Sequence, residues 1–309
     1  MRNWLLPEHI DDLLPDEAAR VERLRRVLLD HFAARGYALV QPPMVEHIES
    51  LATGTGRDLE LQMFRMVDPL SGRMLGLRAD ITPQIARIDA HLLNEAGITR
   101  LCYAGSVLRT RAPVAGSVRE LIQVGAELFG EPRIAGDQEV IALILSALSA
   151  AGVRKLHLDL GHVAVYRALA NGAGIGNNGD DSEMFDALRG KDVPAVEALT
   201  ARLPARTAAA ARARRELPDI PAIANALTAL GALADAAASQ VEALHIDLAD
   251  LSGYHYQNGA TFAVFTVGEP GAIGNGGRYD GIGRAFGRAR PATGFTLDLR
   301  QIAGIVARG

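Results

Sequence analysis

Apolar residues near the start of the chain recur at three- and four-residue steps, the period of a helix with one buried face. In the segment 16–34 this stripe consists of Val21, Leu24, Val27, Leu28 and Phe32. The spacing predicts a helix over these residues. Gly36 is suited to end it, because glycine tolerates the left-handed backbone of a helix C-terminus.

Strand-forming runs bounded by turn residues follow along the rest of the chain. They cover residues 37–40, 61–67, 74–77, 100–108, 120–129, 155–160, 244–248, 261–267 and 293–299. The fourth and fifth runs flank a loop that contains Pro113 and Gly116, which predicts a long antiparallel hairpin. Further helices are predicted over 82–94, where a threonine-proline pair forms a favourable start, and over 140–150, where Gly136 and Asp137 open the helix.

The composition changes between residues 163 and 240, a block that is rich in alanine and poor in strand-forming residues. We interpret this block as an inserted helical subdomain between a first core segment, 1–162, and a second core segment, 241–309. Strands on both sides of a helical block favour an α+β fold, in which helices flank a mainly antiparallel sheet.

Two sequence patterns inside this block are similar to functional motifs. Residues 174–179 match the glycine pattern of a dinucleotide-binding loop, but no strand precedes them and no βαβ unit surrounds them, so we expect a glycine-rich linker. The helix predicted over 205–216 carries four arginines. We interpret it as a solvated helix face rather than as a contact for RNA or an acidic partner.

Overall charge and composition narrow the class of protein. The chain of 309 residues has a formal net charge of -4, which is weak evidence against tRNA binding because neutralising phosphates needs basic surface. No run of eighteen or more apolar residues and no signal-peptide pattern is present, so we expect a cytoplasmic protein with no membrane contact. The one cysteine, Cys102, excludes an intramolecular disulfide and is expected in the core.

Neither a metal site nor a cofactor is expected. The histidines do not pair with the cysteine or with one another at metal-ligand spacing, and no Ser-His-Asp set can be identified.

One face of the predicted hairpin carries polar and charged side chains that could bind a ligand. Gln123 and Glu127 are four residues apart in one strand, so both side chains point to the same side as position 125, and Arg109 and Arg119 flank the turn. These groups suit a zwitterionic ligand, because Glu127 can meet an ammonium and an arginine can meet a carboxylate or phosphate. A charged, solvent-exposed sheet face explains the same residues equally well.

A second segment, 276–281, reads Gly-Gly-Arg-Tyr-Asp-Gly and predicts a tight turn that a ligand or another backbone can approach closely. It contributes the cation of Arg278 and the phenol of Tyr279. Two further tyrosines, Tyr254 and Tyr256, stand two positions apart, so an extended chain presents both on one side. For each of these tyrosines, core packing is the alternative.

Taken in order, these segments resemble the core of the histidyl-type class II aminoacyl-tRNA synthetases over nearly the whole chain. The segment 36–46 is similar to the family's dimer-forming helix-strand motif, and 78–82 is similar to the segment that holds histidine. Gln123 and Glu127 fall where the family binds the amino group of histidine, and Tyr256 matches the first tyrosine of a family signature. The resemblance implies a homodimer.

Several positions depart from the family pattern where adenylate chemistry needs them. Ser252 stands in place of the catalytic arginine, and Arg111 in place of an ATP-holding glutamate. Gln257 replaces a second tyrosine, and Gln301 replaces an ATP-binding arginine, with Arg300 one position away. Loss of one preorganised donor to a developing charge typically costs ~10²–10³ in rate, so efficient amino-acid activation is not expected. The chain ends shortly after the third motif, so we also expect no anticodon-binding domain.

A core that binds histidine without activating it resembles the regulatory subunits of ATP phosphoribosyltransferase, relatives of histidyl-tRNA synthetase in histidine biosynthesis. The resemblance implies a non-catalytic chain that joins the short catalytic ATP phosphoribosyltransferase, supports its activity and mediates feedback inhibition by histidine. The homodimer would then be part of a larger hetero-oligomer. Histidine can inhibit only by binding the less active arrangement more tightly.

The histidine site that the resemblance implies draws on several segments. We expect Glu127 and Gln123 to bind the α-amino group, with Asp80 and Thr82 assisting, and Arg109 to face the carboxylate. The residues expected on the imidazole side and around it are Tyr254, Tyr256, Arg278 and Tyr279.

Three alternatives stay open. The first is a truncated or divergent histidyl-tRNA synthetase that forms histidyl-adenylate, against which the absence of arginine at Ser252 argues. The second is a synthetase-like enzyme that acts on another amino acid or on a protein, against which Arg111 argues. The third is a non-enzymatic tRNA-binding relative, against which the overall acidity argues.

Overall fold

The computed structural model describes residues 5–54, 57–112, 117–173, 194–195, 220–248 and 257–308. Its strands are β1 Ala38–Leu39, β2 Val45–His47, β3 Arg65–Val67, β4 Met74–Leu77, β5 Thr99–Leu108, β6 Glu120–Phe129, β7 Leu156–His162, β8 Ala243–Ile246, β9 Ala260–Thr266, β10 Gly274–Arg278 and β11 Ala292–Asp298. Its main helices are α1 Pro15–Ala33, α2 Ile48–Ala52, α3 Arg57–Leu61, α4 Thr82–Arg87, α5 Ile134–Ala150, α6 Val163–Ala173, α10 Pro221–Ala237 and α11 Leu299–Arg308. The shorter helical segments include the π-helix η1 Ile88–Leu93, η3 Ala238–Gln240 and η4 Ile282–Phe286.

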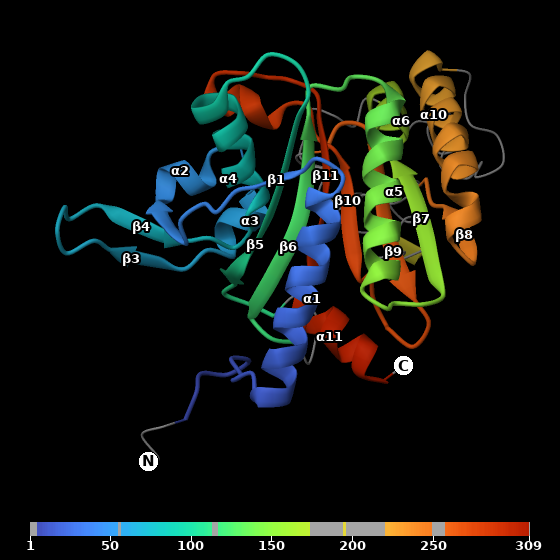
Figure 1. Ribbon diagram of the computed structural model, residues 1–309. Coiled ribbons are helices and arrows are strands. Elements are labelled where there is room, and N and C mark those ends of the chain that lie inside the picture. The colour runs from blue at the N-terminus through green and yellow to red at the C-terminus, as the bar shows by residue number, and fades with distance from the viewer. Residues whose placement is uncertain are drawn as a thin grey trace.

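An eight-stranded sheet, in the order β1-β5-β6-β11-β10-β9-β7-β8, forms the centre of the molecule (Figure 1). The pairs from β5 through to β7 are antiparallel, and only the edge strands β1 and β8 pair in parallel. A three-stranded sheet, β2-β4-β3, projects to one side. The structure therefore confirms the expected α+β fold, with a mainly antiparallel sheet flanked by helices.

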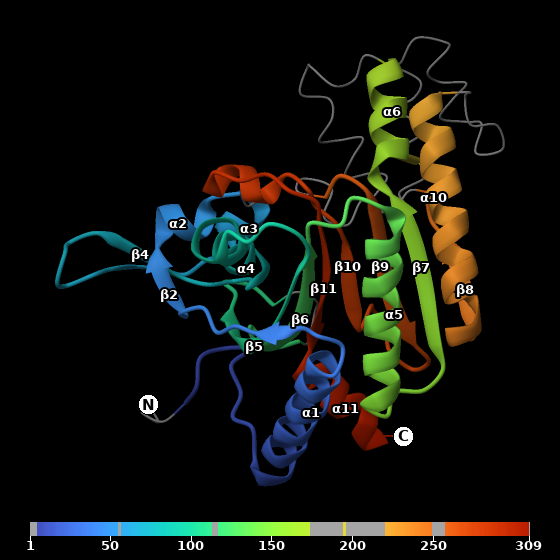
Figure 2. The ribbon, with the colours of Figure 1, turned by 45° about the horizontal axis from the view of Figure 1, so that its top comes forward.

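The two faces of the large sheet carry different layers. Helix α5 crosses one face with α1 and α10 beside it, and the main hydrophobic core lies there (Figure 2). A smaller core on the opposite face joins β5 and β6 to α4 and η4. Because side chains alternate along β6, Val124, Ala126 and Leu128 enter the main core, whereas Gln123 and Glu127 face the α4 side.

The described parts of the block 163–240 include the helices α6 and α10. Five residues of α10 are buried: Ile223, Ala226, Leu230, Leu233 and Ala237. The segment Pro221–Gln240 is long and apolar enough to cross a membrane by length and composition alone, with a mean hydropathy of 1.3. Core helices of globular proteins pass the same test, and α10 packs on α5 and α6. The interpretation of this block as a separate subdomain stays a prediction.

The glycine-rich segment 276–281 forms a turn only at its end, at Asp280 and Gly281, and not at the glycine pair where the turn was expected. Gly274–Arg278 is the strand β10, paired on both sides within the large sheet. A side chain at Gly276 would collide with the ring of Phe262 and with the backbone of Gly294, so the glycines permit close packing inside the sheet rather than a reversal of the chain.

Three smaller boundaries also differ. Leu61 ends the helix α3 instead of opening a strand, and β3 begins only at Arg65. Helix α5 begins at Ile134, just before the Gly136–Asp137 pair that was expected to open it, and a side chain at Gly136 would press against that of Glu131. The short elements β2 and α2 had no predicted counterpart. The segments 174–179 and 205–216 lie outside the described residues.

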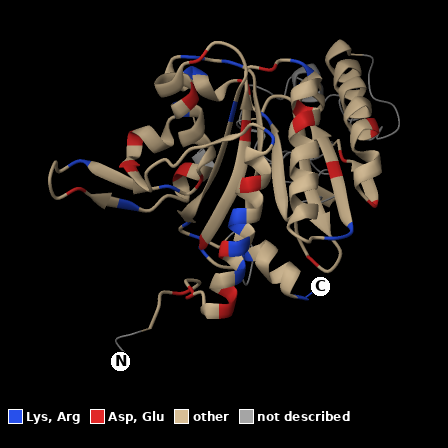
Figure 3. Cartoon of the chain, in the orientation of Figure 1, with Lys and Arg blue, Asp and Glu red and all other residues tan. Residues whose placement is uncertain are grey.

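Charged side chains of both signs are interspersed over the described elements, with a small group of basic residues on α1 (Figure 3). Cys102 is 1% exposed, which confirms its expected place in the core, and burial raises the pKa of its thiol to about 11.

Candidate functional site

Glu127 lies at the centre of a group of polar side chains on the α4 side of the sheet. One carboxylate oxygen, Oε1, accepts hydrogen bonds from Thr82 Oγ1 at 3.0 Å and from the Tyr103 hydroxyl at 3.2 Å. The other oxygen, Oε2, accepts a hydrogen bond from the Tyr279 hydroxyl. We refer to Thr82, Tyr103, Glu127 and Tyr279 as the Glu127 cluster.

The cluster draws its members from elements that are far apart in the sequence. Tyr103 is on β5, Glu127 on β6, Thr82 opens α4 and Tyr279 follows β10. Between β6 and β10 lies β11, where Gly294 pairs with Glu127. A side chain at Gly294 would overlap the Glu127 carboxylate, so this glycine leaves room for the carboxyl group above β11.

Burial is the main influence on the Glu127 carboxyl. The residue is 1% exposed, and desolvation raises its pKa to about 8, with the nearby Asp80 charge acting in the same direction. The hydrogen bonds from Tyr279, Thr82 and Tyr103 lower this pKa. Among the described residues, no ion pair joins Glu127 to an arginine, lysine or histidine. A buried carboxyl with only hydroxyl partners is suited to a ligand that brings a positive charge or N–H donors.

The segment before α4 contributes the groups next to this cluster. Asp80 is half-buried, and its Oδ1 accepts a hydrogen bond from the Thr82 backbone N–H at 3.0 Å. Gln123 is buried, and its Oε1 accepts the Ile81 backbone N–H at 3.1 Å. The structure therefore brings Asp80, Thr82, Gln123 and Glu127 together, as the sequence predicted.

Arg109 lies at the edge of the same region. Its Nε donates to the backbone oxygen of Ala79 at 3.2 Å, one residue before Asp80. Burial raises the pKa of Asp298, which pairs with Gln123 across the sheet, and the charges of Arg300 and Arg109 oppose this rise. Arg109 thus places a cation against the backbone just before Asp80 and within range of the Asp298 charge. This placement fits its predicted role near a ligand carboxylate, which stays a prediction.

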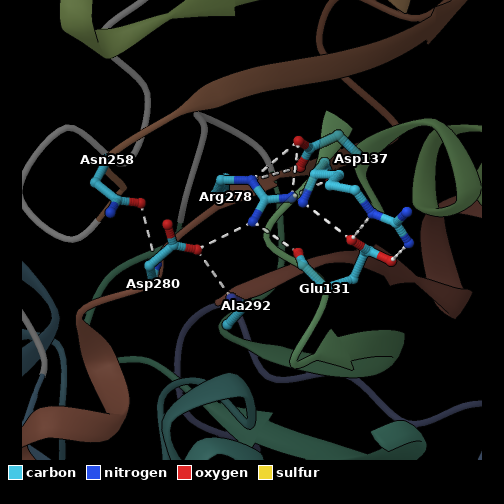
Figure 4. Close-up of polar contacts among 7 residues, drawn as sticks. Glu131, Asp137, Asn258, Arg278, Asp280 and Ala292 are labelled. Atoms are coloured by element: carbon cyan, nitrogen blue, oxygen red, sulfur yellow. Dashed lines mark hydrogen bonds and ion pairs between the residues drawn. The ribbon is translucent and has the colours of Figure 1, made fainter. Parts of the chain in front are cut away.

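Arg278 occupies a different place from the other predicted site residues. It lies on the α5 side of the sheet, where its guanidinium is within 2.9 Å of Asp137 Oδ2 (Figure 4). It also donates to Asp280 Oδ1 at 3.2 Å and to the backbone oxygens of Glu131 and Arg133 at 3.1 and 3.2 Å. We refer to Glu131, Arg133, Asp137, Arg278 and Asp280 as the Arg278 cluster.

Tyr103 and Asp137 were not identified from the sequence. Tyr103 pairs with Gly125 in the hairpin, so its side chain shares a face with Gln123 and Glu127. An exact register for the hairpin would have revealed it, but that register depends on a loop whose length the pattern alone does not set. Asp137 carried no signal beyond its place in the first turn of a helix.

The positions that depart from the synthetase pattern are dispersed in the structure. Arg111 is exposed, and Gln301 is half-buried on α11. Gln257 is buried, and its Nε2 donates to the backbone oxygen of Gly276 at 3.3 Å. Ser252, Tyr254 and Tyr256 lie outside the described residues.

Within the part of the chain that the structure describes, no group of three or more His, Cys, Asp or Glu side chains is placed to hold a metal ion.

The chain is similar in sequence to a known protein family and to individual proteins. The family model of histidyl-tRNA synthetase matches residues 9–302. An ATP phosphoribosyltransferase regulatory subunit of Ralstonia nicotianae is 55% identical, over 99% of this chain and 82% of its own length. The protein of the same name from Thiobacillus denitrificans is 52% identical, over 98% of each chain.

The fold is also similar to that of solved structures with related names. A crystal structure described as an ATP phosphoribosyltransferase regulatory subunit/histidyl-tRNA synthetase from Bacillus halodurans superposes with a TM-score of 0.87 and 25% identity, covering 100% of this chain and 84% of that one. A histidine–tRNA ligase subunit from Alicyclobacillus acidocaldarius shares the fold with a TM-score of 0.77, at 24% identity, covering 100% of this chain and 99% of that one.

Proposed function

The chain belongs to the family of ATP phosphoribosyltransferase regulatory subunits, which has the fold of histidyl-tRNA synthetase, and we propose that it regulates an ATP phosphoribosyltransferase in histidine biosynthesis. The chain binds a short catalytic ATP phosphoribosyltransferase that needs it for full activity. It acts as a homodimer within a larger hetero-oligomer, and histidine bound to it lowers the activity of the complex.

The Glu127 cluster is the observation that carries the histidine part of this proposal. Its buried carboxyl has three hydroxyl donors and, among the described residues, no cationic partner. Free histidine offers two nitrogen-bearing groups, the α-ammonium and the imidazole, and two acidic residues, Glu127 and Asp80, lie near each other here. An ammonium that reaches Glu127 supplies a positive charge and an imidazole supplies a further N–H donor, whereas the described residues place only hydroxyl donors there.

Histidine analogues separate the two possible orientations. Histamine retains the amine and the imidazole but has no carboxylate, so its binding tests the contribution of Arg109. Imidazole propionate retains the ring and the carboxylate but has no amine. If the α-ammonium faces Glu127, as the sequence indicated, imidazole propionate should bind much more weakly than histidine at the same pH, and calorimetry measures both affinities.

Catalysis of amino-acid activation is not part of the proposed function. Replacement of the family's catalytic arginine by Ser252, and of an ATP-holding glutamate by the exposed Arg111, supports a chain that binds histidine without forming an adenylate. Histidine-dependent exchange of pyrophosphate into ATP tests this directly. Exchange well above the background of a mock preparation would favour a divergent histidyl-tRNA synthetase instead.

Formation of phosphoribosyl-ATP is the decisive assay. The short catalytic subunit from the same organism is measured alone, with this chain, and with this chain plus histidine. We expect this chain to stimulate the rate and histidine to suppress the stimulated rate. An unchanged rate together with no complex in size-exclusion chromatography would contradict the proposal. Stimulation that histidine leaves unaffected would retain the activating role and remove the feedback role.

A further inference from the structure

Arg278 and Tyr279 are consecutive residues at the end of β10, and their side chains leave the sheet on opposite faces. Arg278 enters the layer of α5, where it meets Asp137. Tyr279 enters the layer of α4, where its hydroxyl donates to Glu127. Any displacement of the backbone at one of these residues therefore moves the side chain of the other.

The guanidinium of Arg278 is held on several sides at once, as Figure 4 shows. Its nitrogens contact the Asp137 carboxylate in the first turn of α5, the Asp280 carboxylate beyond β10, and two backbone oxygens in the connection that follows β6. Glu127 lies near the end of β6, shortly before that connection. Arg278 therefore ties the end of β10 to the end of β6 across the intervening strand β11.

The residue after Tyr279 is fixed in the same way. Asp280 Oδ1 accepts the backbone N–H of Ala292 at 2.9 Å, and the backbone N–H of Asp280 donates to Asn258 Oδ1 at 3.0 Å (Figure 4). The backbone N–H of Tyr279 itself donates to the oxygen of Ala292 at 2.8 Å. Tyr279 is thus bracketed by two anchored neighbours.

We propose that Arg278 is a positioning residue of the candidate site, whose ion pairs on the α5 side hold the Tyr279 hydroxyl against Glu127 on the α4 side. Its part in ligand binding rests on the proposed function, whereas its effect on Glu127 does not require a ligand. Arg278 acts through Tyr279 and does not itself contact the ligand.

A positioning role has a consequence that a merely structural role lacks. The hydrogen bond from Tyr279 lowers the pKa of Glu127, so a displaced Tyr279 leaves that pKa higher. Among the described residues, the other groups that act on Glu127 are Asp80 just before α4, Thr82 at its start and Tyr103 on β5, and the more distant Tyr37 is coupled to its charge. None of the hydrogen bonds of Arg278 described above is to these residues. General loss of stability would lower the unfolding temperature without moving the titration of one carboxyl in the folded protein.

The test is a carbon-13 NMR titration of the glutamate side-chain carboxyls in the ligand-free full chain, with the Glu127 signal assigned by its loss in Glu127→Gln. Arg278→Lys keeps a positive charge but cannot make the same set of contacts. We expect Arg278→Lys to raise the pKa of Glu127, as Tyr279→Phe does. In the double variant Arg278→Lys/Tyr279→Phe we expect the same Glu127 pKa as in Tyr279→Phe alone. An unchanged Glu127 titration in folded Arg278→Lys, or shifts that add in the double variant, would overturn the proposal.

Arg100→Lys is the matched control, because Arg100 also forms a bidentate pair with a carboxylate on α5, Glu139, at 2.7 and 2.8 Å. That pair anchors the same helix to β5 and not to β10, so we expect Arg100→Lys to leave the Glu127 titration unchanged. A shift as large as that of Arg278→Lys would mean that any loosening of α5 perturbs the site, and the proposal would fail.

If Arg278→Lys does not fold, the variant Arg278→Met/Asp137→Leu replaces it. Exchange of a whole buried ion pair for apolar residues is generally tolerated, while the ties to Asp280 and to the β6 connection are still lost. The expected result is again a raised Glu127 pKa in a folded protein, and an unmoved titration would reject the positioning role.

Histidine binding gives the second readout. At neutral pH we expect Arg278→Lys to weaken histidine binding several-fold, with partial recovery at higher pH where Glu127 ionises, and Arg100→Lys to bind as the wild type does. If the wild-type chain binds no histidine but the NMR shifts occur as expected, the histidine site fails and the positioning role stands. If histidine binds the wild type and Arg278→Lys equally at every pH, the positioning role fails and the histidine site stands.

Discussion

The two faces of the large sheet each bury a carboxyl group, but the protein surrounds the two groups differently. Asp137, which is 4% exposed, receives the guanidinium of Arg278, whereas Glu127, which is 1% exposed, receives only hydroxyl groups among the described residues. Burial raises the pKa of both carboxyls, and at Asp137 the Arg278 charge opposes that rise. Where the described residues supply a cation, the carboxyl is held in an ion pair, and where they supply only hydroxyl groups, the proposed function assigns the carboxyl to a cationic ligand.

Removal of Asp137 should have the largest effect, because it leaves the guanidinium of Arg278 buried without its main partner. Breaking a buried ion pair from one side typically costs ~3–5 kcal/mol, so we expect Asp137→Leu to lower the free energy of unfolding by about that amount. Urea denaturation followed by circular dichroism measures it. Glu127→Gln is the comparison, and we expect it to show no comparable loss of stability at neutral pH. Equal losses in the two variants would show that the two carboxyls do not differ.

The second-largest effect should be a pH dependence of the free energy of unfolding that comes from Glu127. The pKa of Glu127 rises from 4.5 in the unfolded chain to about 8 in the folded one, so the folded state holds the proton more tightly. This contribution to stability is fully present below the unfolded pKa and is lost as the pH rises through about 8, at up to ~1.4 kcal/mol per pH unit. We expect the wild type to lose stability relative to Glu127→Gln between roughly pH 5 and 8, and a constant difference would show that Glu127 does not carry this proton.

Histidine binding tests the Glu127 side directly. A hydrogen bond to a charged group contributes about 1.5–3 kcal/mol, so Glu127→Gln should weaken histidine binding by about tenfold or more in calorimetry. Glu139→Gln, which alters a carboxyl on the α5 side, should bind as the wild type does. An affinity that Glu127→Gln leaves intact would remove Glu127 from the site.

The smallest effects should come from the hydroxyl donors. Tyr279→Phe and Tyr103→Phe each remove one neutral hydrogen bond to Glu127, which is worth about 0.5–1.5 kcal/mol. We expect losses of a few-fold in histidine affinity, with the larger loss at Tyr279, because its hydrogen bond lowers the pKa of Glu127 more than that of Tyr103 does. The same loss in Tyr37→Phe, whose hydroxyl donates to Glu139 on the α5 side, would show that the calorimetric signal does not report the site.

The sequence was informative where a short pattern decides the outcome. The period-two alternation along 120–129 was sufficient to place Gln123 and Glu127 on one face, and the Thr82–Pro83 pair correctly marked the start of α4. The ordered motifs were also sufficient to identify the fold, because each motif is short but their sequence along the chain is specific. The prediction was wrong at 276–278, where local glycine preference indicated a turn and strand pairing on both sides imposed β10, so that the turn falls at 280–281.

By itself, then, the sequence determined the α+β class, the family resemblance and the set of Asp80, Thr82, Gln123 and Glu127, because these follow from local periodicity and from motif order. Only the tertiary structure decided that Arg278 faces α5 while Tyr279 faces Glu127, and that Tyr103 completes the cluster. Alternation along a strand shows that two neighbours point apart, but not which layer lies on which side. That choice depends on the order and register of strands that are distant in the sequence, which are set by the packing of the whole sheet.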